Sequence, residues 1–290
     1  MATSPSVTVF GEVLFDCFPS GEQVLGGAPF NVAWHLQALG DNPLFISRVG
    51  HDENGQKILN AMKQWGMTTS AVQLDSTHPT GQVVVDMIAN EPNYSITADC
   101  AYDYIDAKEM PKLTQGTLLY HGSLGLRNPV ARHAFHTLVE HYRPALFLDI
   151  NLRPPWWNKN EVLDWMSQAT WVKLNEHELH ELGYTEPSYQ QAMIACKDEF
   201  ELDQIILTRG AKGACVLTAD NEIHQVALDP VENVIDTVGA GDAFTAVYLH
   251  GLINNWSVDQ SIEIAQQFAC RVVGLRGATT NDLNFYKLEW

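Results

Sequence analysis

Residues 236–244 read DTVGAGDAF, and they lead directly into the apolar stretch TAVYLHGLI at 245–253. Asp242 stands where this pattern predicts the start of a helix. An Asp there can simply cap the helix, while Gly239 and Gly241 allow a tight turn. The alternative is functional: backbone N–H groups at a helix N-terminus bind an anion, with a carboxylate beside them. The loop alone leaves both interpretations open.

The composition indicates a globular protein with an acidic surface. The chain has 290 residues, 46% of them hydrophobic, which is enough material for a sizeable core. Its 17 basic and 35 acidic residues leave a formal charge of −18. Such a surface repels nucleic acid and anionic membranes, and no apolar run approaches the ~20 residues of a membrane span. We therefore expect neither nucleic acid nor a membrane as a partner.

The cysteines and histidines favour neither a disulfide framework nor a zinc centre. The cysteines are scattered singly and form no CxxC pair: Cys17, Cys100, Cys196, Cys215 and Cys270. This pattern is typical of reduced thiols. The N-terminus lacks the basic segment and cleavage pattern of a secretion signal, and HELH at 177–180 is not the HExxH zinc motif. The sequence therefore predicts a cytoplasmic protein.

Apolar runs bounded by turn residues alternate with helical patterns along most of the chain. We expect strands within 7–18 (ending near Asp16), 43–50, 116–125, 145–151, 170–175 and 204–210, and a hairpin over 213–228. Helices are expected at 29–40, 54–66, 130–143, 160–168 and 176–199, with two more after the opening loop. Near-continuous apolar strands separated by helices indicate a parallel sheet covered on both faces. Ligands of such sheets bind beyond the carboxyl ends of the strands.

The stretch 80–105 departs from this alternation. It contains strand-like runs with a turn at NEPN, residues 90–93, and no helix between them. We expect a small β-rich insertion beside the main sheet.

Two common nucleotide-binding signatures are missing. The chain contains no GxxxxGK[ST], which argues against a P-loop nucleotidase. GAGDAF lacks the third glycine of GxGxxG, and the first strand leads into DCFPSGEQ rather than a glycine-rich turn. An NAD-dependent oxidoreductase is therefore not favoured.

A second glycine-rich stretch, LGGAPFNVA at 25–33, gives the opening loop its context. With Gly40 and Gly50 following at set spacing, it resembles the first signature of the ribokinase-like (PfkB) carbohydrate kinases. DTVGAGDAFTA, about two hundred residues later, resembles the second signature of that family. GEVLFD, RVGHDENG, KLNEHEL and LTRGAKG extend the resemblance over most of the chain, and LDINLRPPWW is most similar to fructokinases.

The resemblance implies a fold and an architecture. The fold would be a three-layer α/β/α arrangement with a mainly parallel sheet, forming one domain over 1–290. A small β-rich lid, built from segments near 12–30 and 80–106, would close over the sugar. Homodimers could form through this lid.

The resemblance also implies roles for the opening loop. Asp242 would accept the proton of the acceptor hydroxyl, and the N–H groups of Gly239, Ala240, Gly241 and Asp242 would hold γ-phosphate oxygens. Glycine matters there because a side chain would block the approach of the backbone to phosphate.

Further site residues follow from the same resemblance. The sugar would be bound by Asp16, Gly26, Gly27, Asn31 and Arg153, and ATP by Asn175, Thr208, Gly210, Gly213, Gly239 and Gly241. Glu178 would organise Mg²⁺ through water, and Asp236 would hold K⁺ together with backbone oxygens from 272–281.

Three of these assignments keep a structural alternative. Asn175 and Glu178 can be a first-turn helix pair, Asp236 can merely end a strand, and Arg153 can form a structural ion pair.

The expected activity is the ATP- and Mg²⁺-dependent phosphorylation of a sugar, converting D-fructose to fructose 6-phosphate. GGAPFN favours the fructokinase branch, because ribokinases more often carry Lys-Gly after the paired glycines. The alternatives are 2-keto-3-deoxygluconate, ribose or a nucleoside as substrate, or a catalytically silent sugar-binding regulator on the same fold.

Overall fold

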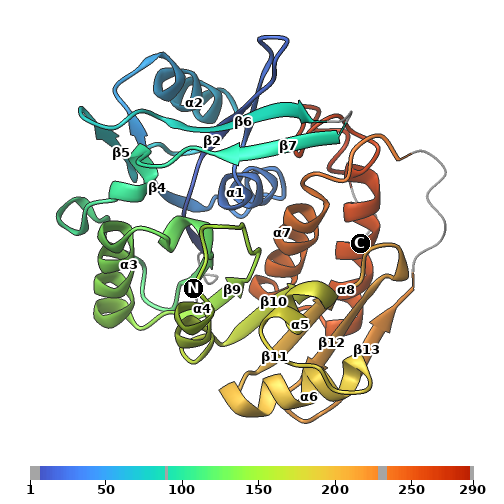
Figure 1. Ribbon diagram of the computed structural model, residues 1–290. Helices are drawn as coiled ribbons and strands as arrows, with labels where there is room; N and C mark the ends of the chain where they lie inside the picture. The colour runs from blue at the N-terminus through green and yellow to red at the C-terminus, as the bar shows by residue number, and fades with distance from the viewer. Residues whose placement is uncertain (1–6, 89–90, 228–233, 288–290) are drawn as a thin grey trace.

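A nine-stranded sheet forms the centre of the computed structural model, which describes residues 7–88, 91–227 and 234–287 (Figure 1). In spatial order the strands are β13 (Ile223–Val226), β12 (Ala214–Thr218), β11 (Gln204–Thr208), β10 (Trp171–Asn175), β9 (Ala145–Asp149), β8 (Leu118–Gly122), β1 (Val7–Phe10), β4 (Leu44–Gly50) and β5 (Val72–Asp75). From β11 to β5 every neighbouring pair is parallel. The predicted hairpin is confirmed, since β12 and β13 pair antiparallel at the edge.

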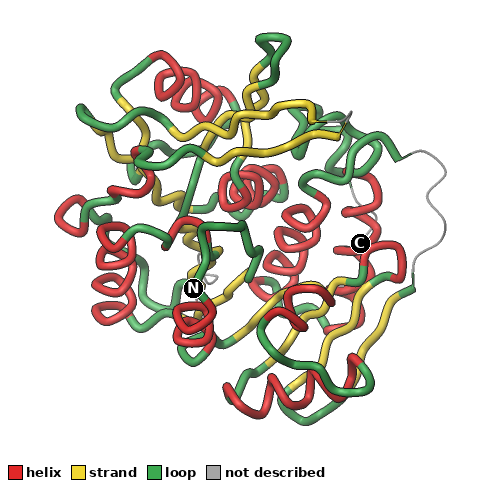
Figure 2. Tube along the Cα trace, in the orientation of Figure 1, coloured by secondary structure: helices red, strands yellow, loops and turns green. Residues whose placement is uncertain are grey.

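Helices cover both faces of the sheet, and Figure 2 shows how they alternate with the strands. On one face lie α1 (Ala28–Ala38), α2 (Glu53–Gln64), α7 (Ala240–Ile253) and α8 (Val258–Val272). On the other lie α3 (Pro129–Tyr142), α4 (Lys159–Met166), α5 (Glu176–Glu181) and α6 (Tyr189–Phe200). Each face buries its own hydrophobic core. The parallel strands are therefore apolar on both sides, as their sequences predict.

The predicted single strand over 7–18 is wrong in one respect: the chain breaks into β1 and β2 (Leu14–Cys17), which belong to different sheets. Gly11 donates its N–H to Ile46 O, and the chain then turns away from the large sheet. A Cβ on Gly11 would lie 2.5 Å from Cγ of Pro29. The break therefore occurs where the chain packs against the first turn of α1, a contact that the apolar pattern does not encode.

The segment that breaks away belongs to a second, four-stranded sheet. Its order is β3 (Gln23–Gly26), β2, β6 (Gly81–Ile88) and β7 (Glu91–Ile96). The expected β-rich insertion is thereby confirmed. The turn predicted at 90–93 is not found there: residues 91–93 belong to β7, and residue 90 lies outside the described residues. Together the two sheets and their helices confirm the predicted three-layer α/β/α fold with a smaller β-rich sheet.

The predicted helix over 176–199 is in fact two helices, α5 and α6. Gly183 has φ +105°, a conformation that follows the end of many helices. Pro187 then disfavours helix in the residue before it, and Ser188 caps the start of α6. Short 3₁₀ turns complete the chain at Ala101–Tyr104, Ala107–Glu109, Leu124–Leu126 and Gly210–Lys212. No helix among the described residues combines the length and apolarity needed to cross a bilayer.

Phe135 on α3 tests the packing on one face of the sheet. Its buried ring lies 5.4 Å from the Phe10 ring and 4.4 Å from the His121 ring, measured between centroids. We expect Phe135→Ala to lower the free energy of unfolding by about 3–5 kcal/mol. Val130→Ala on the same helix is the control, because Val130 is 43% exposed. Chemical denaturation would measure the free energy of unfolding of both variants. Equal losses in Phe135→Ala and Val130→Ala would contradict this packing.

Candidate active site

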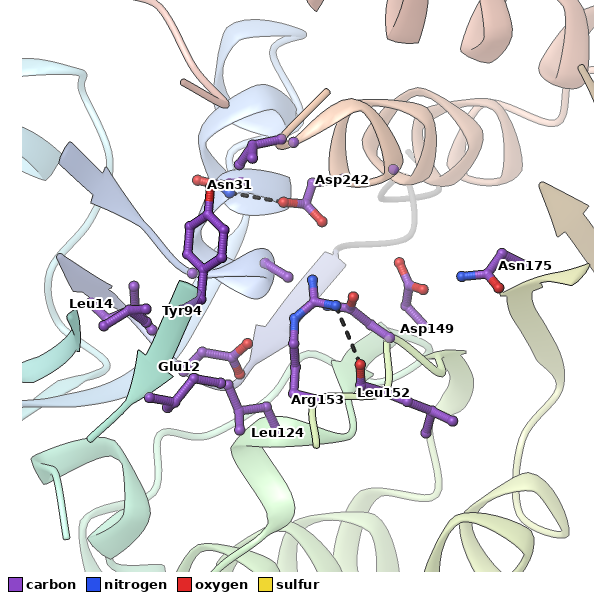
Figure 3. A pocket seen from close by; sticks show the side chains of 18 of the residues that line it. Glu12, Leu14, Asn31, Tyr94, Leu124, Asp149, Leu152, Arg153, Asn175 and Asp242 are labelled. Carbon is purple, nitrogen blue, oxygen red and sulfur yellow. Dashed lines mark hydrogen bonds between the residues drawn. The ribbon is translucent and has the colours of Figure 1, made fainter. Parts of the chain in front are cut away.

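A cavity of about 730 Å³ lies beyond the carboxyl ends of β9, β10 and β11, between the large sheet and the small one (Figure 3). Most of the predicted site residues line it: Asp16, Gly27, Asn31, Arg153, Asn175, Glu178, Thr208, Gly239, Gly241 and Asp242. These residues come from segments spread over most of the chain. The structure therefore brings together in one place what the sequence motifs singled out separately.

The remaining predicted residues line two adjoining cavities. One, of about 410 Å³, is largely apolar and includes Gly210, Gly213 and Ala240. It shares Thr208, Thr237 and Gly241 with the main cavity. The other, of about 260 Å³, includes Gly26 and Asp236 and shares Asp16, Asn31, Tyr94 and Val238 with the main cavity.

The start of α7 faces the main cavity without a side-chain cap. Gly239 precedes the helix with φ +81°, and a Cβ there would lie 2.2 Å from Cβ of Ala278. Only glycine therefore fits. The N–H of Ala240 lies 3.4 Å from Thr237 O, a weak interaction. The first N–H groups of a helix have no partner within it and carry the positive end of its dipole, so this terminus suits an anion.

Asp242 lies in the first turn of α7 and does not cap the helix. Its Oδ2 accepts a hydrogen bond of 2.8 Å from Nδ2 of Asn31, on α1 (Figure 3). The pKa of Asp242 is raised to about 6, mainly by burial and in smaller part by the nearby Asp149 carboxylate. The hydrogen bond from Asn31 and the charges of Lys173 and Arg153 act in the opposite direction. A carboxyl with this pKa exchanges protons readily near neutral pH.

A buried ion pair that the sequence analysis missed lies next to Asp242. Nζ of Lys173 donates to both carboxylate oxygens of Asp149, at 3.0 and 2.9 Å. The hydroxyl of Thr245, on α7, lies 2.9 Å from Asp149 Oδ2 and 2.9 Å from Gly241 O. The pair therefore ties β9 and β10 to the first turn of α7. A signal was present, because each charge interrupts an otherwise apolar strand.

Asp16 stands on β2, in the small sheet. Its pKa is raised to about 6, mainly by burial; the charge of Arg153 acts in the opposite direction, and the charge of Asp236 adds to the rise. Gly26 stands on the paired strand β3, and a Cβ there would lie 3.4 Å from Asp16 Oδ2. The carboxyl therefore has little side-chain bulk around it on that side, which leaves room for a ligand.

Arg153 is exposed to the cavity, and its Nη1 donates to the carbonyl of Leu152 at 3.3 Å. Among the described residues it forms no ion pair within 4 Å. Its charge lowers the pKa values of Glu12, Asp16 and Asp242. The alternative interpretation, that Arg153 forms a structural ion pair, is therefore not supported among the described residues.

Asn175 and Glu178 form a capping box at the start of α5. Asn175 Oδ1 accepts from the N–H of Glu178, and Glu178 Oε2 accepts from the N–H of Asn175, both at 2.9 Å. Glu178 Oε1 also accepts from Leu152 N–H, and burial raises the pKa of this carboxyl. Asn175 and Glu178 therefore do form the first-turn helix pair that was the structural alternative. Both residues also line the cavity.

The donor set near Glu178 fits a hydrated Mg²⁺ better than a directly bound one. Each carboxylate oxygen keeps one lone pair beyond its N–H partner, and Mg²⁺ in nucleotide sites usually keeps several waters. No cluster of three or more His, Cys, Asp or Glu side chains that could hold a metal occurs in the described part of the chain.

Asp236 joins the glycine-rich loop to the segment after α8. Its Oδ1 accepts from the N–H of Val238 at 3.0 Å, and its Oδ2 lies 3.4 Å from the N–H of Gly277. The N–H groups of Ile235 and Asp236 donate to Val273 O at 2.8 and 3.1 Å. Asp236 therefore lies against residues 272–281, from which the sequence analysis expects backbone oxygens for K⁺; that cation site stays a prediction.

The comparisons with known proteins agree with this geometry. Residues 10–284 match the model of the pfkB family of carbohydrate kinases, so the chain belongs to that family. It is an ATP-dependent carbohydrate kinase.

Among its relatives the chain is most similar to fructokinases. It is 29% identical to the fructokinase of Escherichia coli, over 96% of this chain and 96% of that protein. It is also 28% identical to the aminoimidazole riboside kinase of Salmonella typhimurium, over 97% and 92%. Among solved structures, a fructokinase double mutant of Vibrio cholerae O395 with fructose, ADP and potassium bound superposes with a TM-score of 0.81. That protein is 25% identical, and the match covers 95% of this chain and 94% of the other.

Asp242→Asn tests the assignment of the base, because it keeps the shape of the side chain and removes its proton affinity. A positioned base contributes roughly 10²–10⁴-fold, so we expect kcat to fall by about that factor. Sugar affinity and melting temperature should change little. In the native enzyme, kcat/KM should rise with pH through the region near 6, because only the ionised carboxylate accepts a proton.

Asp259→Asn, on the neighbouring helix α8, is the matched control, because its side chain is 74% exposed. It should leave kcat unchanged. If kcat of Asp242→Asn stays within about threefold of the native value, the decrease is smaller than the loss of a base would cause, and this role is ruled out.

Proposed function

We propose that the protein transfers the γ-phosphoryl group of ATP to the primary hydroxyl of fructose, giving fructose 6-phosphate and ADP. The observation that carries the proposal is the uncapped start of α7, with the Asp242 carboxyl beside it, facing a polar cavity. A base and an anion-binding terminus next to each other are what phosphoryl transfer to a hydroxyl requires.

In the proposed reaction Asp242 accepts the proton of the attacking hydroxyl. The hydroxyl oxygen forms a bond to the γ-phosphorus, and the bond from that phosphorus to the oxygen of the departing ADP breaks. The N–H groups of Gly239, Ala240, Gly241 and Asp242 donate to the equatorial phosphoryl oxygens, supported by the dipole of α7. With a pKa of about 6, Asp242 is mostly ionised at neutral pH, as a base must be.

The two larger cavities suit the two substrates. The polar cavity would hold the sugar, with Asp16, Gly26, Gly27, Asn31 and Arg153 as its contacts. The largely apolar cavity beside Thr208, Gly210 and Gly213 would hold the nucleoside part of ATP. Gly241 lines both cavities, so the γ-phosphate would lie at their junction. Asn175 would contact the phosphates from the sheet side.

Mg²⁺ bound with ATP would neutralise charge on the phosphates. Glu178 and Asn175 would hold its waters, in keeping with their remaining hydrogen-bonding capacity.

A kinetic panel tests the choice of fructose as substrate. We expect fructose to give a higher kcat/KM than ribose, 2-keto-3-deoxygluconate and aminoimidazole riboside. Asp16→Ala should raise KM for fructose about 10- to 100-fold, because the sugar loses a charged acceptor. The Kd of ATP, measured by calorimetry, should stay the same.

The panel and the Asp16→Ala variant test two assignments separately, the identity of the substrate and the role of Asp16. A higher kcat/KM for another sugar would overturn fructose as the substrate. If Asp16→Ala lost ATP binding and kept sugar binding, Asp16 would contact ATP and not the sugar.

We also propose that K⁺ activates the enzyme through Asp236. The support is the position of Asp236 between the glycine-rich loop and residues 272–281, and the potassium ion in the fructokinase of Vibrio cholerae. A weakly hydrated cation held by loop oxygens would turn the N–H groups of 239–242 toward the phosphate.

Rates in Na⁺, K⁺ or a bulky organic cation at constant ionic strength test the K⁺ proposal. K⁺ should stimulate the native enzyme but not Asp236→Ala. Equal native rates in all three salts would contradict a cation site, as would K⁺ stimulation that survives in the variant.

Three further features remain proposals. The small sheet would act as a lid, within a single domain over 1–290, because it forms one wall of the cavity with Asp16 and Tyr94.

Homodimers would form through the face of the small sheet that points away from the cavity. On that face Val84 is 41% exposed, between the buried Val83 and Val85. A cytoplasmic location is supported by five free cysteines.

A further inference from the structure

Glu12 is a buried carboxyl in the cavity that the proposed reaction does not use and that, unlike Asp149, has no ion pair within 4 Å among the described residues. It lies between β1 and β2, where the chain passes from the large sheet to the small one. Its side chain is only 2% exposed, yet it lines the cavity, and Figure 3 shows its carboxyl on the side of Arg153. Within the described part of the chain, its Oε2 is buried and has no hydrogen-bond partner.

Two backbone segments lie close to Glu12, one at its carboxyl and the other at its main-chain carbonyl oxygen. A Cβ on Gly125 would lie 3.2 Å from Glu12 Oε2, and a Cβ on Gly27 would lie 2.8 Å from Glu12 O. Both glycines therefore allow segments to approach Glu12 more closely than other residues would. The Gly125 segment therefore limits the positions that the carboxyl can take, while the Gly27 segment packs against the backbone of Glu12.

The surroundings of Glu12 suit a neutral ligand that donates hydrogen bonds. The pKa of Glu12 is raised to about 7, mainly by burial and in smaller part by the charge of Asp242. A hydrogen bond with its own backbone and the charges of Arg153 and Arg127 act in the opposite direction. A second acceptor in the same cavity, Oδ1 of Asn31, is also buried without a partner among the described residues. Buried acceptors left without a partner destabilise the protein relative to a state in which they are hydrogen-bonded. A polyhydroxyl ligand would satisfy both.

The spacing along the chain places Glu12 in line with Asp16. Residues 12, 14 and 16 all line the cavity, as alternate positions of an extended segment do. Asp16 stands at the end shared with the cavity near Asp236, and Glu12 at the end toward Leu124. Leu14 between them offers only an apolar contact. The two carboxyls can therefore address different parts of one sugar.

We propose that Glu12 is a specificity-determining residue that forms a hydrogen bond with one hydroxyl of the bound sugar, a hydroxyl other than those bound by Asp16. The inference rests on the proposed function, because it assumes that the cavity holds the sugar. A purely structural carboxyl would affect all sugars alike, whereas a hydroxyl contact affects one hydroxyl only.

Single-deoxy analogues of the sugar that gives the highest kcat/KM in the panel test this proposal. The native enzyme should lose about 10- to 100-fold in kcat/KM with the analogue that lacks the hydroxyl bound by Glu12. Glu12→Ala should lose a similar factor with the parent sugar and should no longer distinguish that analogue from the parent. It should still distinguish the other analogues. Glu12→Gln should show a smaller loss with the same pattern, because it keeps a neutral acceptor.

Leu14→Ala is the matched control from the same wall of the cavity, and its loss should be the same for every analogue. If Glu12→Ala does not fold, Glu12→Gln alone decides: its loss relative to the native enzyme must be present with the parent sugar and absent with the one analogue that lacks the hydroxyl bound by Glu12. Equal losses of the Glu12 variants with every analogue, or no loss at all, would overturn the proposal. A best substrate other than fructose would refute the proposed substrate only, because the analogues are then made from that other sugar.

Discussion

The first turn of α7 can serve the reaction only while it is held against the carboxyl edge of the sheet, and the Lys173–Asp149 ion pair holds it there. Thr245 extends this pair to the carbonyl of Gly241, so two strands and the helix start share one polar cluster. All three side chains are buried. Removing one partner of a buried pair typically costs about 3–5 kcal/mol, because the other charge is left uncompensated. The same contacts that stabilise the fold therefore position the anion-binding terminus.

The electrostatics of the cavity explain how an acidic protein can bind ATP. Glu12, Asp16 and Asp242 all have pKa values raised by burial, and Arg153 moderates each of them. The formal charge of the chain is −18, so its overall field repels an anionic ligand. Attraction has to be local, and in the proposed function the N–H groups of α7 provide it at short range. The carboxyls would, in turn, bind the neutral hydroxyls of the sugar.

The sequence predicted the fold well wherever local pattern and tertiary environment agree. The middle of β11 is apolar because both faces of the sheet are covered, and Gly239 fits against Ala278 only because it has no side chain. The predictions were wrong at 7–18, where the chain changes sheets, and they missed the Lys173–Asp149 pair. Both features depend on contacts between residues far apart in the chain. The hydrogen bond from Asn31 to Asp242 spans 211 positions, so no local pattern can reveal it.

The central claim is that the start of α7 brings the base and the phosphate together at one point. A crystal structure with fructose and a non-hydrolysable ATP analogue tests it most directly. The account predicts the primary hydroxyl of fructose within about 3 Å of a carboxylate oxygen of Asp242. It also predicts the γ-phosphate on the N–H groups of residues 239–242. A sugar bound away from Asp242, or a γ-phosphate held by side chains without contact to these N–H groups, would contradict the account.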